Sequence, residues 1–121
     1  MKRDLDLIRY ILICIENSDS TKITINDLIN ADYDAPTISF HISLLLDNGY
    51  IEATKFNAIG QHYQQYLIKR ITASGYDYLD NVRDIKIWSK TKELLKTMGN
   101  SASLELIKAI AGKVALNFLK P

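Results

Sequence analysis

A change of hydrophobic period at Gly49 constrains the fold more than any other feature of the sequence. From Pro36, which suits the first turn of a helix, apolar residues recur at helical spacing up to the glycine. Gly49 fits the left-handed position that ends a helix. Residues 50–56 and 66–71 then have strand character, and a polar, glycine-containing connection at 57–62 joins them. The pattern predicts a helix that leads directly into a β-hairpin.

The segments on either side of this hairpin predict further helices and a small strand. Asp4 is placed to cap a first helix, and the β-branched residues 22–24 predict a small strand before a brief helix at 26–30. After the hairpin, Thr72 is placed to cap another helix. Gly75 lies in the first turn of that helix, where glycine costs stability, so it predicts a close approach of another segment.

The final third of the chain is predicted to be helical. One helix covers residues 83–98 and is closed by residues 99–100, and Ser101 or Ser103 caps the last helix. Eleven of the sixteen residues at 104–119 are apolar, which is more than one helical stripe. Packing against the preceding helix accounts for about one face only. The rest predicts that two copies pair through Leu104, Ile107, Ile110, Ala111, Val114 and Phe118.

Composition is that of an ordinary globular protein. The 121 residues are 47% hydrophobic and 24% charged, enough for one modest core. The single cysteine, Cys14, allows no internal disulfide and is interpreted as filler in the first helix. The sequence shows no signal peptide and no apolar run of about 18 residues, so we expect a cytoplasmic protein. Attachment to a membrane surface through Lys108, Lys113 and Lys120 is disfavoured by Glu105.

Two local motifs resemble those of winged helix-turn-helix repressors of the arsenic type. Residues 39–51, SFHISLLLDNGYI, are similar to Ser-x-His-Leu-x-x-Leu-x-x-x-Gly-Leu-Ile, and residues 70–79, RITASGYDYL, to Leu-Thr-x-x-Gly-x-x-x-Leu. The resemblance implies that the longer helix enters the major groove of DNA and that His41 orients this helix. It implies a mainly α fold with a two- to three-stranded β wing. Residues 1–83 would form the winged helix-turn-helix domain, and 84–121 a helical, dimerising extension.

A wider resemblance covers nearly the whole chain. It rests on the opening MKRDLDLIR, on Ile38-x-x-His41, on Ile71-Thr72-x-x-Gly75, and on the motifs between Tyr78 and Lys92. These segments are similar to a family of small bacterial and phage proteins classed as a domain of unknown function. That family has no assigned activity, so function is argued from the residues of this chain.

Charge is divided unevenly along the chain, which bears on DNA binding. Residues 1–54 hold four basic and nine acidic side chains, whereas residues 55–121 hold eleven basic and five acidic ones. Affinity for duplex DNA comes largely from Lys and Arg that neutralise phosphates. The predicted recognition segment, residues 34–48, contains no Lys or Arg, so the common pairing of Arg with guanine is absent from it.

Other side chains of the helix and the wing offer hydroxyl, aromatic, amide and basic groups to DNA. The candidate DNA-binding residues are Thr37, Ser39, Phe40, His41, Ser43, Lys55, Gln61, His62, Lys69 and Arg70. For the wing, a hairpin that is merely solvated remains open as the alternative. For Arg83, Lys86 and Lys90, a solvated helix face is the simpler interpretation.

Metal and enzymatic chemistry find no support in the sequence. His41 and His62 lack the further ligands that a metal site needs, and no nucleophile–base pair or phosphate loop is present. We therefore expect no catalytic residue, metal or cofactor. The favoured hypothesis is a homodimeric regulator that binds double-stranded DNA and originates from a phage or other mobile element. The alternative, favoured by the acidic first half, is a winged-helix module that binds a protein partner and no DNA.

Overall fold

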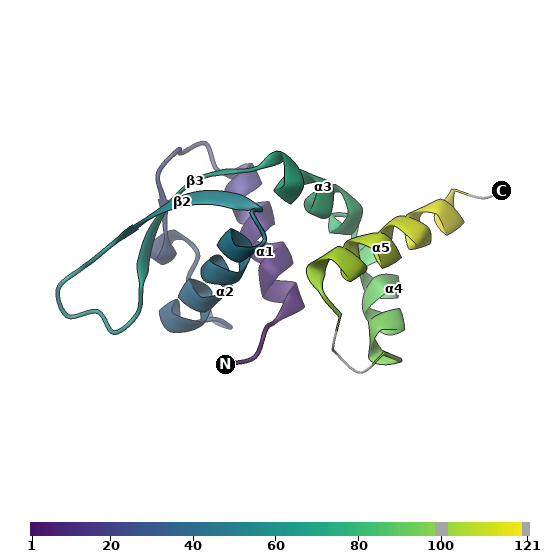
Figure 1. Ribbon diagram of the computed structural model, residues 1–121, viewed down its shortest axis with the longest axis horizontal. Helices are drawn as coiled ribbons and strands as arrows, with labels where there is room; N and C mark the ends of the chain where they lie inside the picture. The colour runs from purple at the N-terminus through teal and green to yellow at the C-terminus, as the bar shows by residue number, and fades with distance from the viewer. Residues whose placement is uncertain (99–101, 120–121) are drawn as a thin grey trace. The chain divides into compact units, whose positions relative to one another are not determined.

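The computed structural model describes residues 1–98 and 102–119. Two compact units make up the chain, Met1–Gly75 and the residues from Tyr76 onward. The elements are α1 (Leu5–Asn17), β1 (Ile23–Thr24), the 3-10 turn η1 (Ile25–Asp27), α2 (Ala35–Asp47), β2 (Ile51–Phe56), β3 (Gln65–Ile71), α3 (Ala73–Val82), α4 (Ile85–Lys96) and α5 (Leu104–Phe118) (Figure 1). The predicted fold class, mainly helical with a small β wing, is confirmed.

Helix α1 supplies much of the core of the first unit. Asp4 caps it as predicted, because the Leu7 amide donates to the Asp4 carboxylate over 3.1 Å. One side of the helix is buried: Leu7, Ile8, Ile11, Leu12 and Ile15. Each such side chain contributes about 1.5–3 kcal/mol on burial, more than the roughly 1 kcal/mol of a helix cap. Packing of this stripe therefore dominates the stability of α1.

Helix α2 begins and ends at the residues that the sequence indicates. Asp34 accepts a hydrogen bond from the Thr37 amide at 3.0 Å, and Pro36 lies in the first turn. At the other end Gly49 has φ of 69°, and the Tyr50 amide donates back to the Leu45 carbonyl at 2.9 Å. These local signals place the start of the hairpin directly after the helix.

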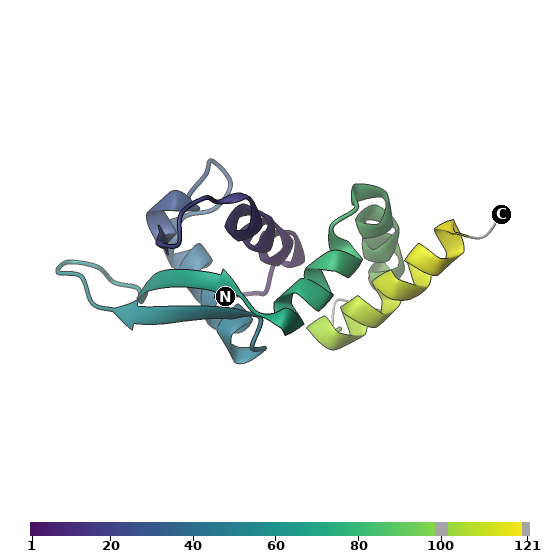
Figure 2. The same ribbon diagram turned by 90° about the horizontal axis from the view of Figure 1, so that it is seen from above.

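The sheet has the strand order β1-β3-β2, and both pairs are antiparallel. The pairing of β2 with β3 shifts between Glu52 and Ala53, which leaves Lys69 as an extra residue in a bulge. The loop between β2 and β3 extends beyond α1 and α2 in both views (Figures 1 and 2). The brief helix predicted at 26–30 is instead the single turn η1. It is tightened by Asp27, whose carboxylate accepts from the Thr24 amide at 2.9 Å.

Gly75 confirms the predicted close approach at the start of α3. A Cβ atom there would lie 2.1 Å from the Tyr50 carbonyl oxygen, closer than any side chain can come. The same carbonyl accepts from the Thr72 amide at 2.9 Å, and Thr72 Oγ1 accepts from the Gly75 amide at 3.1 Å. The glycine thus lets α3 begin directly against the end of α2.

The second unit is built on the packing of α4 with α5. Asp84 caps α4, and Ser103 caps α5 by accepting from the Leu106 amide at 3.1 Å. Trp88 and Thr91 are buried on α4. The residues predicted to close α4 and the alternative cap Ser101 lie outside the described residues. Within the described ranges, no helix combines the length and the apolar character that crossing a membrane requires.

Candidate nucleic-acid interface

A buried hydrogen bond joins the first half of α2 to the wing. The Ser39 side chain is 5% exposed, and its hydroxyl donates to the Gln64 carbonyl at 2.6 Å. The Gln64 side-chain amide in turn donates to the carbonyls of Phe56 and Gln65, both at 3.0 Å. These bonds hold the outer ends of β2 and β3 beside the N-terminal half of α2. Helix and wing therefore contribute to one continuous face of the first unit.

His41 lies inside the unit and joins α2 to the start of α1. Its side chain is 0% exposed, and the Asp4 backbone amide donates to Nε2 at 2.8 Å. An amide N–H can only donate, so Nε2 accepts and the ring proton is on Nδ1. Nδ1 lies 2.8 Å from the Thr37 carbonyl, to which it donates. The two bonds fix the imidazole as a neutral tautomer that orients the helix, in agreement with the role that the resemblance implies.

Tyr33 extends this joint to the segment before α2. Its hydroxyl donates to the Asp4 carboxylate at 3.0 Å. Burial and the neighbouring Asp4 carboxylate raise the pKa of Tyr33 to about 12. Neither the Asp4–His41 contact nor the Asp4–Tyr33 contact was found from the sequence, because the partners lie 37 and 29 residues apart.

The structure separates the candidate DNA-binding residues into two groups. Ser39 and His41 are buried and engaged in the contacts above, so neither side chain is on the surface. The half-buried residues are Thr37, Phe40 and Ser43, and the exposed ones are Lys55, Gln61, His62, Lys69 and Arg70. The face that DNA could reach is therefore made of three α2 residues and the wing, without Ser39 and His41.

The N-terminus of α2 carries a fixed negative charge. The side-chain and backbone hydrogen bonds of Thr37 hold the pKa of the exposed Asp34 carboxyl below its ordinary value. A helix N-terminus is otherwise a favourable site for phosphate. Since an ionised carboxylate already lies there, α2 does not offer this site to a DNA backbone.

The cations available to phosphate lie on the strands. Lys55 and Lys69 are exposed, whereas Arg70 forms an ion pair with Glu52 at 2.7 Å. The hydrogen bond of that pair raises the pKa of Arg70 and lowers that of Glu52, and the carboxylate offsets the charge of the guanidinium. A further cation was missed from the sequence. Because Ile23 pairs with Ile68, their neighbours Lys22 and Lys69 come from adjoining backbone positions.

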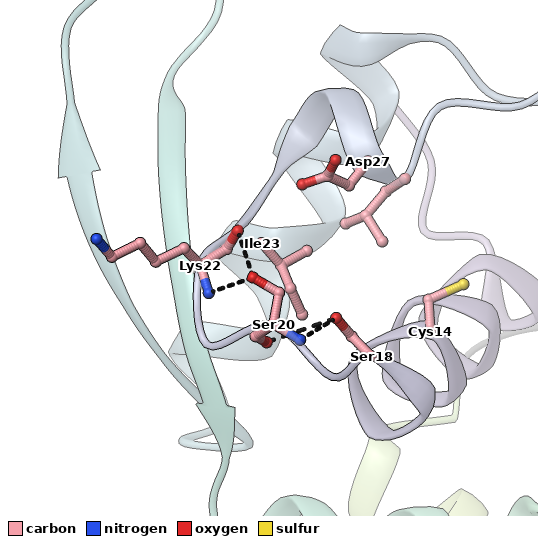
Figure 3. A pocket seen from close by; sticks show the side chains of 7 residues that line it. Cys14, Ser18, Ser20, Lys22, Ile23 and Asp27 are labelled. Carbon is pink, nitrogen blue, oxygen red and sulfur yellow. Dashed lines mark hydrogen bonds between the residues drawn. The ribbon is translucent and has the colours of Figure 1, made fainter.

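A small hollow beside β1 provides no ligand site of its own. Its volume is about 290 Å³, and it is lined by Cys14, Ser18, Ser20, Lys22, Ile23, Asp27 and Leu28 (Figure 3). Its hydroxyls bond to the local backbone: Ser18 accepts from the Ser20 amide at 3.1 Å and Ser20 from the Lys22 amide at 3.0 Å. The Lys22 side chain points away from Asp27 and Cys14 (Figure 3). In the described parts of the chain, no group of three or more His, Cys, Asp or Glu is placed to hold a metal.

Most of the residues predicted to pair two copies lie in the core of the second unit. Leu104, Ile107, Ala111 and Val114 are buried on α5, where α4 packs against it. Ile110 is half-buried, and Phe118 is 56% exposed. Phe118 lines a groove of about 400 Å³ together with Lys90, Leu94, Val114 and Asn117. The apolar surface that remains open is therefore this groove and the end of α5.

Comparison with known proteins assigns the chain to a family. The family described as "Hypothetical protein (DUF2513)" matches residues 2–101. The chain belongs to this family. A protein of Haemophilus influenzae, described as "Uncharacterized protein", is 29% identical over 119 residues, which cover 98% of this chain and 99% of that protein. No solved structure matches the chain significantly. The predicted relationship to a small family without an assigned activity is confirmed.

Proposed function

We propose that this chain is a winged helix-turn-helix protein that binds double-stranded DNA and regulates transcription. The observation that carries the proposal is the Ser39–Gln64 hydrogen bond, because it makes one face from the first half of α2 and the wing. The order of helices and strands and the sheet order β1-β3-β2 support it. In this proposal the protein acts in the cytoplasm and originates from a phage or other mobile element.

The charges on this face assign different tasks to its two parts. Thr37 and Phe40 on α2 offer a hydroxyl and an aromatic ring to base edges, contacts that include the thymine methyl. Phosphate contact falls to Lys55, Lys69 and Lys22, because α2 has no basic residue and begins with Asp34. So few cations predict modest affinity with a shallow dependence on salt.

Titration of labelled duplex DNA over a salt series tests the proposal. We expect binding of mixed-sequence duplexes at low salt, weakening as salt rises. Replacing both Lys55→Glu and Lys69→Glu weakens binding across all sequences and lowers the salt slope by about 2, since each lysine contributes about 1. Arg70→Glu has a smaller effect than Lys69→Glu, because Glu52 already engages Arg70.

Lys113→Glu is the matched control, because Lys113 is an exposed lysine on α5 in the other unit. It leaves DNA affinity unchanged if binding belongs to the first unit. Absence of binding by the unaltered protein at low salt would refute the DNA-binding proposal. Equal weakening by Lys113→Glu and the wing variants would show attraction by net charge without a defined face.

We also propose that two copies pair through the second unit. The support is the open groove of α4 and α5 with the exposed apolar residues beside it, Leu94, Leu116, Phe118 and Leu119. A symmetric pair brings the same patch of each copy together, so every apolar residue is buried twice. A stable interface needs about 800 Å² per partner, and these side chains form its apolar centre.

Light scattering of the full chain tests this pairing. Phe118→Glu is expected to convert the dimer to a monomer, because it places a charge in the apolar centre. Leu106→Glu, at an exposed position near the other end of α5, should leave the dimer intact. A dimer that survives Phe118→Glu, or an unaltered protein that is monomeric, would overturn the assignment. Removing α5 is not a suitable test, since it exposes the core of the unit.

One observation favours a second function, the binding of a protein partner in place of DNA. The outer side of α2 carries acidic residues at both ends, Asp34 and Asp47, with half-buried Phe40 and Leu44 between them. Such a face suits an apolar partner with basic flanks better than it suits phosphate. The salt titration separates the two functions, because a protein-binding module shows no duplex affinity at low salt.

A further inference from the structure

The tip of the wing presents an apolar side chain to solvent. Ile59 is fully exposed, and the next residue, Gly60, has φ of 81° and turns the chain back. The Gln61 amide donates to the Ala58 carbonyl at 3.4 Å and closes the turn around Ile59. Because all of its surface is in solvent, the Ile59 side chain does not stabilise the fold by burial.

The residues around Ile59 distinguish it from an isolated surface isoleucine, which is common in soluble proteins. Residues 57–65 contain no Lys, Arg, Asp or Glu. Asn57, Gln61 and His62 are exposed beside the isoleucine and carry amide and imidazole groups. The minor groove of A·T pairs presents only the acceptors adenine N3 and thymine O2, which amide donors match.

We infer that Ile59 is a wedge that enters the minor groove and inserts between base pairs at a flexible pyrimidine–purine step such as TA. Gln61 and His62 contact the base edges beside it. This inference rests on the proposed DNA-binding function and adds the structural class of its target, DNA that is easily unstacked. Apolar side chains inserted in this way unstack one step and bend the duplex.

Bending compensates for the small number of cations on this unit. A straight duplex that meets α2 finds Asp34 and no basic residue on that helix. A duplex bent at the wing wraps around more of the protein surface, which brings more phosphates toward Lys55, Lys69 and Lys22. The energy of unstacking is smallest at TA and CA steps, so the preferred target follows from deformability.

Two measurements on duplexes of about 20–30 bp test the wedge. The duplex carries one central TA step with 2-aminopurine in place of the adenine, and a second version carries energy-transfer dyes at its ends. Binding of the unaltered protein is expected to raise the 2-aminopurine fluorescence and to bring the ends together. Ile59→Asn should abolish most of both signals, while affinity stays within about tenfold because the phosphate contacts remain.

Ala58→Asn is the matched control, since it places the same side chain at the neighbouring exposed position. It should keep both signals, and Ile59→Leu should keep them as well. Binding without unstacking overturns the wedge and leaves the proposed function intact, whereas absence of binding overturns both. Unstacking that survives Ile59→Asn, or that is lost equally in Ala58→Asn, also overturns the assignment to Ile59.

Discussion

The base and the tip of the wing are held by opposite kinds of contact. At the base, Ser39 is buried and bonded to the Gln64 carbonyl. At the tip, Ile59, Gln61 and His62 are exposed, and the turn is closed by one long backbone hydrogen bond. The base therefore fixes where the wing points. The tip leaves its side chains available to a partner.

The two histidines show the same contrast within one residue type. His41 is engaged at both ring nitrogens by the backbone of Asp4 and Thr37, whereas His62 is exposed on the wing. A buried imidazole with two fixed partners has little freedom to contact DNA. The comparison teaches that burial decides which histidine is structural and which is available for binding.

The largest expected effect comes from His41→Ala. It removes a fully buried ring and leaves the Asp4 amide without its acceptor, so we expect a loss of about 3 kcal/mol in the free energy of unfolding. Urea denaturation measures this as a lower midpoint. His62→Ala, the control at the exposed position, should change stability by less than about 0.5 kcal/mol. Similar losses for both variants would show that the two histidines do not differ as described.

Ser39→Ala is expected to have the next largest effect on stability. It leaves the Gln64 carbonyl without the Ser39 donor in a buried setting, which costs about 1–2 kcal/mol. Ser43→Ala is the matched control, because the Ser43 hydroxyl donates only to the Phe40 carbonyl within the same helix. Urea denaturation of both variants gives the comparison. A Ser39→Ala variant as stable as Ser43→Ala would remove the base of the wing as a stabilising joint.

A smaller effect is expected at alkaline pH through Tyr33. Its pKa is raised from 10.0 to about 12, so its neutral form is favoured in the folded protein. The stability that this contributes is fully present below pH 10 and is lost as the pH rises through about 12. Ultraviolet titration of phenolate formation should show one late-ionising tyrosine that is absent in Tyr33→Phe. Ionisation of Tyr33 together with the exposed tyrosines would contradict the Asp4–Tyr33 contact.

Local chemistry explains which parts of the fold could be predicted from the sequence. Asp34, Pro36 and Gly49 each act within a few residues of their own position, so the bounds of α2 follow from residue type. Gly75 is similar, because a glycine that weakens a helix indicates a close neighbour even when the neighbour is unknown. The brief helix expected at 26–30 was less certain ground, since one turn depends on a single carboxylate, that of Asp27.

The candidate site could be predicted only in part, because its decisive contacts join distant residues. Ser39 and Gln64 are 25 residues apart, and Asp4 and His41 are 37 apart. Periodicity places Ser39 and His41 on α2 and gives no account of which surface covers them. The apolar excess of α5 likewise predicted burial on more than one side, but not that α4 covers Leu104 and Ile107.

The smallest expected effect on stability tests the tip of the wing. Replacing Gln61→Ala and His62→Ala together should change the free energy of unfolding by less than about 0.5 kcal/mol, because both side chains are exposed. The same variant should lose preference for A·T-rich over G·C-rich duplexes, by about tenfold for one lost base-edge contact. Fluorescence anisotropy with two duplexes of equal length measures this preference. A large loss of stability would show that the tip packs on the fold. Equal weakening on both duplexes would show that these side chains contact only the backbone of DNA.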